Sequence, residues 1–581
     1  MSDPQLSPME IVDDQFNHND PIGGTKLDLT IEDQRVLQAL SLPEGQQWML
    51  SSIAYHREYA RTLCSMYNAT ATIHRYLPPE LLMEIFGWIR PENFGELRLL
   101  GVSRVWRDLL LRTAEFWVDM LRSTFPPTKR LTSSHPNFDP ESGWHRCYTM
   151  SLERSAPRDI FLTYTGFTEL AFTALSPHTQ RIASLSVELY PQNAQHLFRL
   201  LRFELPRLET LNVSHAHVAG QHAEELGGGT LPQLPQSSDH VDLPFLHVLH
   251  IPSVLCTSIS AGNLRSLTIG CSSCNMCAEA RRPSLDDILS FLRRCPALTS
   301  LRFLKTSEPA RSRRHTEKGP MSLNQLHELI FEDVSASWAS DILRRLTLLF
   351  HTVVKFRDLG TSRIPQRIKT LPAIHASDRL ALEFRKDGGG PIICEADASI
   401  GDTSFVNVQV AVNTQNPADH DPVGSVASAF GSASVKQLRL WIPTSSLRID
   451  RTRTIQLLAS FPSITRLTWK RQIPNDLFQA LQTPTSAGAP ICAGLEHLIV
   501  HWRLGSQCDE TIFRGACNLI LSTLGYRASL GSRLRKFVFK CEGLRRAGPR
   551  FDAEGEKERL AQTFRTLVDE VVVGLRLDTT D

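Results

Sequence analysis

The chain has 581 residues, with 63 Lys and Arg against 61 Asp and Glu and a formal net charge of +2. This length predicts several domains or one long repeat array. The near-neutral charge excludes nucleic-acid binding by bulk electrostatics, because neutralising phosphates requires a clear excess of Lys and Arg. Twelve cysteines are too few for a disulfide scaffold and suit a reducing compartment.

The first 44 residues predict an acidic, disordered leader. Residues 1–35 contain eight Asp or Glu and only two basic residues, whereas a secretory signal requires a basic start followed by an apolar core. No run in the chain approaches the ~18 apolar residues of a membrane span. We therefore expect an intracellular protein, cytoplasmic or nuclear, with no membrane partner.

Residues 45–73 predict a helix with one apolar stripe. The stripe residues recur at spacings of three and four, as the successive turns of a helix require: Met49, Ile53, His56, Ala60, Leu63 and Tyr67. A short helix usually gains its stability from tertiary contacts, so we expect it to pack against the next domain. A coiled-coil dimer over three heptads is the alternative.

Residues 74–122 predict three short helices with broad apolar faces. Pro78 and Pro79 suit the first turn of a helix, and Glu80 complements the positive end of its dipole. A second helix is predicted from Leu97 to Leu111, and a third begins near Glu115. Three such helices cannot bury all their apolar residues among themselves, so we expect an interaction surface.

This segment resembles the F-box, which binds a Skp-family adaptor in cullin–RING ubiquitin ligases. The residues that carry the resemblance are, in order, Leu77-Pro78-x-Glu80, Ile85-Phe86, Val102-Ser103-x-x-Trp106-Arg107-x-Leu109 and Trp117. The commonest form of the motif has Cys in place of Ser103. The resemblance implies adaptor contacts at Leu77, Pro78, Leu81, Leu82, Ile85, Phe86, Val102 and Trp106. The alternative is a simple three-helix packing unit in which Trp106 and Trp117 belong to the core.

Residues 123–180 are expected to form a linker and the first strands. The stretch 151–157 contains Ser151-Leu152-Glu153-Arg154, which is similar to an element that often follows the F-box in fungal proteins of this type. We read it as a turn-rich segment that leads into a strand at Ile160–Tyr164.

Residues 181–545 contain a repeated pattern of an apolar residue, then Leu three positions later, then an apolar residue two positions further on. A stricter form that begins Pro-x-[Leu/Ile] occurs at Pro206, Pro244, Pro296 and Pro462. The pattern resembles the leucine-rich repeat, which implies one short strand per unit in an irregular α/β solenoid. Helical spacing within 285–295 predicts a helix between two of the strands.

The pattern fades over the 109 residues between Leu329 and Leu438. Period-two alternation predicts strands at 380–384 and 405–410, which we interpret as parts of degenerate repeat units. A helix from Glu554 to Leu577, within the final segment 546–581, is expected to cap the array.

The sequence lacks the motifs of a catalytic site. No nucleophile elbow, zinc-protease helix or phosphate-binding loop is present, so we expect no enzyme and no cofactor. An enzyme within 340–430 is the alternative. Cys271, Cys274 and Cys277 are spaced like metal ligands, but a structural zinc needs a fourth, for which Cys256, Cys295 and His250 are candidates. We expect loop thiols and no metal.

Two basic clusters are either solvated edges of the array, a localisation signal or a patch for an anionic substrate. Their residues are Arg311, Arg313, Arg314, His315 and Lys318 in the first, and Arg533, Arg535, Lys536, Lys540, Arg545, Arg546 and Arg550 in the second.

Taken together, the resemblance implies a substrate-recognition subunit that links an unknown target protein to a Skp-family adaptor and a cullin for ubiquitylation and degradation. A protein-interaction scaffold without a ubiquitylation role is the alternative.

Overall fold

The computed structural model describes most of the chain after the first 29 residues. The described ranges are 30–70, 76–91, 94–123, 143–189, 194–215, 241–270, 283–305, 319–359, 364–386, 392–412, 421–442, 449–471, 475–486, 488–503, 510–543 and 552–576. Three features predicted above lie outside them: most of the acidic leader, the Cys271–Cys277 cluster, and the basic residues at 311–318 and 545–550.

The chain divides into two compact units. The first comprises Met1–Phe86 and Gly95–Arg112, and the second comprises Gly87–Phe94 and Thr113–Asp581. The helices at or within the first unit are α1 (Ile31–Ala39), α2 (Leu42–Ala69), α4 (Pro79–Trp88), the 3₁₀ helix η1 (Phe94–Gly101) and α5 (Arg104–Arg112).

Helix α1 corrects the predicted extent of the leader, because residues 31–39 are helical. The acidic residues that suggested disorder form caps. Thr30 Oγ1 accepts a hydrogen bond from the Asp33 backbone N–H at 3.2 Å, and the Ser41 backbone N–H donates to the Glu44 carboxylate at 3.1 Å. Such contacts satisfy N–H groups that have no partner within the first turn of a helix.

Helix α2 confirms the predicted N-terminal helix but not the packing expected for it. Its stripe residues Met49, Ile53 and Leu63 are exposed, so no described residue covers this face. The alternative, a coiled-coil dimer, stays a prediction.

The predicted second helix of the F-box-like segment is interrupted. Instead of one helix from Leu97 to Leu111, the chain forms η1, a break at Val102–Ser103, and then α5. Ser103 Oγ accepts a hydrogen bond from the Trp106 backbone N–H at 3.1 Å, which is the geometry of an N-cap. Hence the residue that departs from the commonest F-box pattern starts helix α5.

Helix α6 (Ala114–Ser123) belongs to the second unit, where it packs against α7 (Gly143–Arg154) and strand β1 (Ile160–Thr165). Its aromatic residues Phe116 and Trp117 are fully buried, and the Arg122 guanidinium lies 4.0 Å from the centre of the Phe161 ring. The Leu152–Arg154 stretch forms the end of α7, so our reading of it as a turn was wrong.

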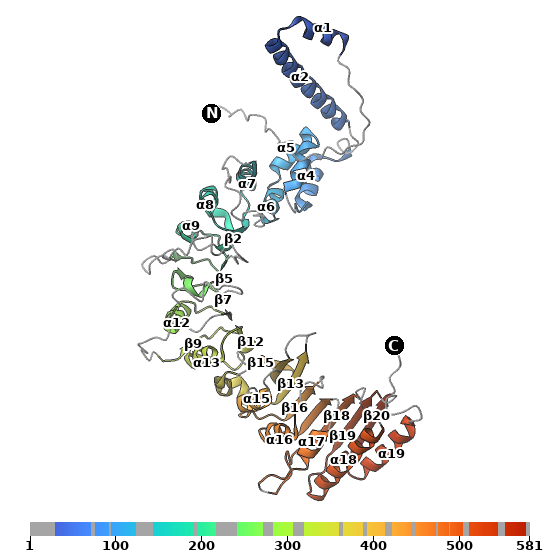
Figure 1. The fold of residues 1–581 in the computed structure, drawn as a ribbon. Helices are drawn as coiled ribbons and strands as arrows, with labels where there is room; N and C mark the ends of the chain where they lie inside the picture. The colour runs from blue at the N-terminus through green and yellow to red at the C-terminus, as the bar shows by residue number, and fades with distance from the viewer. Residues whose placement is uncertain are drawn as a thin grey trace. The chain divides into compact units, whose positions relative to one another are not determined.

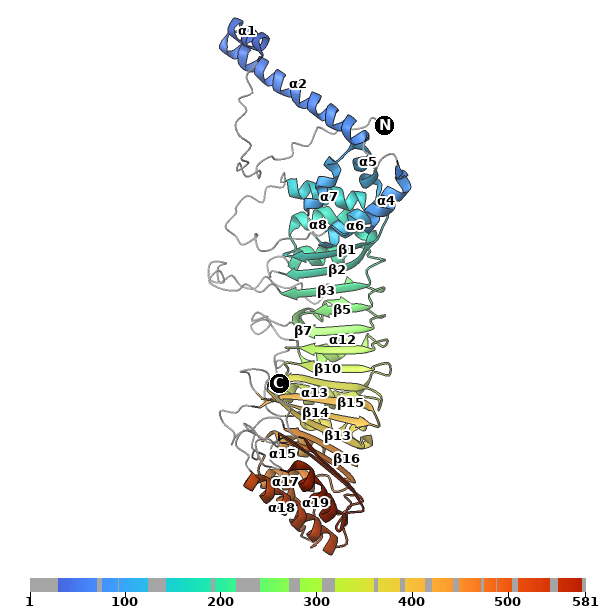
Figure 2. The ribbon, with the colours of Figure 1, turned by 90° about the vertical axis from the view of Figure 1, so that its right-hand side faces the viewer.

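A 16-stranded sheet dominates the second unit (Figures 1 and 2), which confirms the α/β fold class. Neighbouring strands are parallel, except that β14 is antiparallel to both of its neighbours. In spatial order the strands are β1, β2 (Ile182–Leu189), β3 (Thr210–His215), β5 (Val248–Ile251), β7 (Ser266–Gly270), β8 (Ser300–Leu304), β10 (Glu328–Glu332), β12 (Val353–Leu359), β15 (Thr403–Val412), β14 (Ile392–Ile400), β13 (Arg379–Lys386), β16 (Gln437–Ile442), β17 (Arg466–Arg471), β18 (His497–Arg503), β19 (Lys536–Glu542) and β20 (Glu570–Arg576).

Helices connect many of these strands, and two short sheets complete the unit. The helices are α8 (Glu169–Leu175), η3 (Ser176–Arg181), α9 (Ala194–Leu201), η5 (Ser253–Leu255), α12 (Leu285–Arg293), α13 (Ala336–Arg345), η6 (Gln366–Thr370), α14 (Pro372–Ala376), α15 (Pro422–Phe430), α16 (Arg451–Ala459), α17 (Asn475–Leu481), α18 (Glu510–Ser529) and α19 (Ala553–Arg565). The short sheets pair β4 (Val241–Asp242) with β6 (Ile259–Ser260), and β9 (Met321–Ser322) with β11 (Leu346–Thr347).

The repeated Leu of the sequence pattern occupies one register row of the sheet. From β2 to β10 this row contains Leu185, Leu211, Leu249, Leu267, Leu301 and Leu329. From β16 to β19 it continues with Leu438, Leu467, Leu498 and Phe537. All these side chains are buried, so the pattern marks the core of the sheet.

The prolines of the stricter pattern lie in tight turns that lead into the strands. In each turn the carbonyl of the residue before Pro accepts a hydrogen bond from the backbone N–H of the second residue after Pro. Leu208 donates to Leu205 in this way, and Leu246 donates to Leu243, both at 3.2 Å. The turns around Pro296 and Pro462 have the same hydrogen bond, at 3.3 Å. Proline is favoured at the second position of a β-turn because its ring fixes φ near the required value.

The long gap in the pattern contains four strands of the large sheet, together with the short β11. The predicted strands at 380–384 and 405–410 are present as parts of β13 and β15, and the sequence analysis missed β12 and β14. The chain passes from β12 to β13, reverses twice, and returns β15 to the side of β12. The segment is therefore a three-stranded antiparallel insertion rather than a series of repeat units in chain order.

The predicted terminal helix is only half helical. Helix α19 ends at Arg565, and Glu570–Arg576 form β20 at the edge of the sheet. Val571, Val572 and Val573 explain the error, because their apolar character fits a helical stripe while their β-branched side chains favour a strand.

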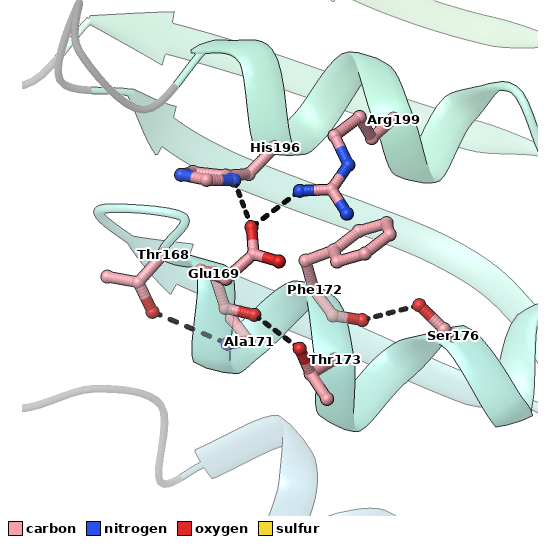
Figure 3. A network of polar contacts seen from close by, with 8 residues as sticks. All are labelled: Thr168, Glu169, Ala171, Phe172, Thr173, Ser176, His196 and Arg199. Carbon is pink, nitrogen blue, oxygen red and sulfur yellow. Dashed lines mark hydrogen bonds and ion pairs between the residues drawn. The ribbon is translucent and has the colours of Figure 1, made fainter. Parts of the chain in front are cut away.

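A polar network joins the helices α8 and α9 (Figure 3). The Glu169 carboxylate lies 2.7 Å from Arg199 Nη1 and 2.6 Å from His196 Nδ1, and the Arg199 guanidinium stacks 4.1 Å from the centre of the Phe172 ring. Because Glu169 and Arg199 are half exposed, this pair orients the two helices and contributes little stability.

Arg527 of α18 is a buried cation, 1% exposed. Its guanidinium donates hydrogen bonds of 2.8 Å to the backbone carbonyls of Ile491 and Cys492. Burial lowers the pKa of Arg527 from its ordinary value. The side chain thereby fastens the turn before β18 to a helix, since its charge-assisted hydrogen bonds replace those of water.

Candidate functional site

The eight residues of the F-box resemblance occupy three different environments in the structure. Leu82 and Phe86 are buried, at 2% and 1% exposure. Leu77 and Trp106 are half buried. The remaining four, Pro78, Leu81, Ile85 and Val102, are exposed.

The buried residues hold helices α4 and α5 together. The rings of Phe86 and Trp106 meet edge to face, with their centroids 5.1 Å apart. This arrangement is favourable because the positive edge of one ring points at the negative face of the other. Phe86 therefore packs within this chain and leaves other residues to meet a partner.

The exposed face of α4 is defined by Leu81 and Ile85, which are 45% and 46% exposed. They are separated by four positions, so they lie one above the other on the helix. Two large apolar side chains that are neighbours on one helix form an exposed apolar surface, and such surfaces often mark sites where another protein binds.

Three further exposed apolar residues of the F-box-like segment were not among the predicted contacts, and one of them is Trp88 at the end of α4, which is 78% exposed. Tyr76 lies just before α4 and Val105 lies in the first turn of α5. The sequence could have indicated Val105 as a contact, because Val105 directly precedes Trp106 within the motif. We name the set Tyr76, Leu81, Ile85, Val102 and Val105 the exposed apolar set.

The polar groups around these residues supply no catalytic arrangement. Glu80 and Glu84 are exposed on α4, and the Arg107 side chain donates to the Leu100 carbonyl at 2.9 Å. The arrangement suits the binding of a protein surface.

The described residues contain no group of three His, Cys, Asp or Glu side chains that could hold a metal ion. Burial raises the pKa of Cys256 to about 12 and that of Cys295 to about 11, so both thiols are protonated at neutral pH. Both side chains are fully buried in the hydrophobic core of the second unit.

A pocket in the second unit lies between the turn at 201–206 and the segment 241–245. Its lining is mixed: it includes the exposed rings of Phe203 and Phe245, with Arg202, Glu204 and Asp242 as its charged members. It lies outside the segment 340–430, where the sequence analysis left an enzyme open.

No protein-family model matches the chain, and a search of curated proteins finds no match. None of the helices in the described ranges combines the length and apolar character that crossing a bilayer would require.

Proposed function

We propose that the chain is a substrate-recognition subunit of a cullin–RING ubiquitin ligase, in which the F-box-like segment binds a Skp-family adaptor and the repeat-bearing sheet holds a target protein. The observation that carries this proposal is the exposure of Leu81 and Ile85 on a helix whose sequence resembles the F-box. An amphipathic helix that places such residues in an apolar groove is a common mode of protein recognition.

The expected contribution of these two residues to adaptor binding follows from their exposure. Full burial of a Leu or Ile side chain is worth about 1.5–3 kcal/mol. Since Leu81 and Ile85 are already about half buried, covering the rest is worth roughly 1 kcal/mol for each. A carboxylate at either position would cost more, because it would be buried without a partner.

The sheet of the second unit supports the receptor half of the proposal. In its repeated strands, buried residues alternate with residues that remain accessible, as in β2 and β16. An interaction surface built from many strands can hold a target and raise its concentration near the ubiquitin-loaded enzyme. On this proposal the protein performs no covalent chemistry.

The test is capture of a purified Skp-family adaptor by the full-length chain. Leu81→Asp and Ile85→Asp should each weaken binding more than about a hundredfold. Leu530→Asp is the matched control, because Leu530 has a similar exposure of 43% and lies in the turn after α18. Binding that is equal in all three variants, or no binding by the unmodified chain, would refute the proposal.

A scaffold without a ubiquitylation role would bind the adaptor in the same way. The half-life of a captured target distinguishes a degradation receptor from a scaffold, when it is compared between cells that carry the unmodified chain and cells that carry Ile85→Asp. Only a degradation receptor makes the target more stable when the adaptor contact is lost.

A further inference from the structure

Strands β16–β19 expose one face of the sheet. Their buried side chains, such as Leu467 and Val500, lie on the side covered by α16–α19, and Figures 1 and 2 both show these helices along one side of the strands. Because successive residues of a strand point to opposite sides, the alternating residues lie on the uncovered side.

This uncovered side is basic. Its cations without an acidic partner among the described residues are Arg439 of β16, Arg466 and Lys470 of β17, Arg503 of β18 and Lys540 of β19. We name these five residues the basic face. Glu542 is the one acidic residue that β16–β19 place on this side.

The register of the strands brings part of the basic face into one line. Lys470, His501 and Lys540 are direct neighbours across β17, β18 and β19, and Trp441 of β16 precedes them in the same row. On its other side Trp441 neighbours Glu383 of β13, which is ion-paired with Arg385. Neighbouring strands lie about 4.8 Å apart, so the row from Trp441 to Lys540 spans roughly 14 Å. The Trp441 ring is 42% exposed, with Lys470 Nζ 5.3 Å from its centre.

The charged residues of strands β8–β14 are arranged differently. There the cations meet acids across adjacent strands, as in Arg302 with Glu332 and Lys355 with Glu328. Arg385 of β13 similarly meets Glu395 of β14 at 3.1 Å. Cross-strand pairing of opposite charges is the usual arrangement in a sheet. Within β16–β19 the one such neighbour pair is Arg503 with Glu542, so Arg439, Arg466, Lys470 and Lys540 leave a local positive potential in a chain whose net charge is only +2.

The second basic cluster of the sequence is largely neutralised by the fold. Arg533 pairs with Asp569, and Lys536 pairs with Glu570. Arg535 lies 3.4 Å from Glu496. Of the described members of that cluster, Lys540 alone contributes to the basic face, together with cations that lie up to a hundred residues earlier in the sequence.

We propose that the basic face binds an acidic segment of a target protein, with Lys470 and Lys540 contacting its carboxylates and Trp441 packing against its backbone or an apolar side chain. This inference rests on the proposed function, since it names the chemistry of the target held by the sheet. A target segment suits the face better than nucleic acid does, because single strands are held by several stacking aromatic rings, and Trp441 is the one aromatic side chain that β16–β19 expose.

The experiment measures binding of the full-length chain to a fluorescent peptide of about twelve residues that alternates Glu and Gly, against the same peptide with Gln for Glu. The test variant is Lys470→Gln with Lys540→Gln. The matched control is Arg533→Gln with Arg535→Gln, which removes the same charge from ion-paired positions. A single-stranded DNA of equal length is the competitor.

We expect the acidic peptide to bind the unmodified and control proteins alike, and the test variant to bind it about tenfold more weakly. The peptide with Gln should not bind. Equal affinity of the test and control variants would overturn the proposal, as would a preference for DNA that depends on the same two lysines. Adaptor capture, measured in parallel, should be unchanged in both variants, so a failure of the adaptor proposal would be visible separately.

Discussion

Replacing Phe86 with Ala should destabilise the packing of α4 against α5. It should not remove a direct contact with the adaptor. Phe86 is 1% exposed and meets Trp106 edge to face at 5.1 Å. Truncating a buried Phe to Ala costs about 3–5 kcal/mol, and the lost aromatic pair is part of that cost. A unit of few short helices has little stability in reserve, so this loss is comparable with its whole free energy of unfolding.

Native-state hydrogen exchange provides the assay, because it reports local opening residue by residue. In Phe86→Ala the amides of α4 and α5 should lose protection, while those of β16–β19 keep it. Ile85→Ala is the control: Ile85 is 46% exposed, so its truncation should cost only about 1 kcal/mol of local stability. If Phe86→Ala kept full protection in both helices and still lost the adaptor, Phe86 would be a direct contact and our reasoning from burial would be wrong.

Three further predictions concern the second unit. Arg527→Met should lower its thermal midpoint, measured by calorimetry, because two carbonyls lose their charge-assisted donors; an unchanged midpoint would contradict this role. Burial, and then the two neighbouring lysines of the basic face, hold the pKa of His501 below its ordinary value. Glu542 acts in the opposite sense. A bound carboxylate favours the protonated ring, so affinity for the acidic peptide should rise as the pH falls through the pKa that His501 has in the complex, and this rise should vanish in His501→Gln. A hydrogen bond from Arg559 lowers the pKa of Glu556, so this pair stabilises the fold above about pH 4.5 and ceases to do so as the pH falls through the lowered pKa. Glu556→Gln should therefore flatten the loss of stability in acid denaturation.

The F-box-like helices and the repeated strands could be predicted because each depends on local patterns. The repeated Leu, followed two positions later by another apolar residue, predicts a strand from a few residues alone. Leu211, Leu301 and Leu467 all lie in the same register row of the sheet. The helix beginning at Pro79 and the helix within 285–295 likewise followed from proline chemistry and apolar spacing. These features are encoded by residues within a few turns of one another.

The secondary-structure predictions were wrong where one local sequence pattern is compatible with two different structures. The valines 571–573 fit both a helical stripe and a strand, and the edge of β19 decided for the strand by supplying backbone partners. The acids near Thr30 and Ser41 fit both disorder and helix caps, and the caps formed. Which apolar residues of the F-box-like segment are exposed could not be read from spacing either, because Ile85 and Phe86 are adjacent in the sequence.

The sequence by itself determined the repeated strands and the helix that begins at Pro79, since side-chain size, branching and turn chemistry act over a few residues. Only the tertiary structure decided which of those residues meet. It placed Trp441, Lys470 and Lys540 in one line across three strand pairings while ion pairs neutralised the arginines next to Lys540 in the sequence. The physical reason is that charge and burial depend on distance in space, and the register of a sheet sets those distances between residues far apart along the chain.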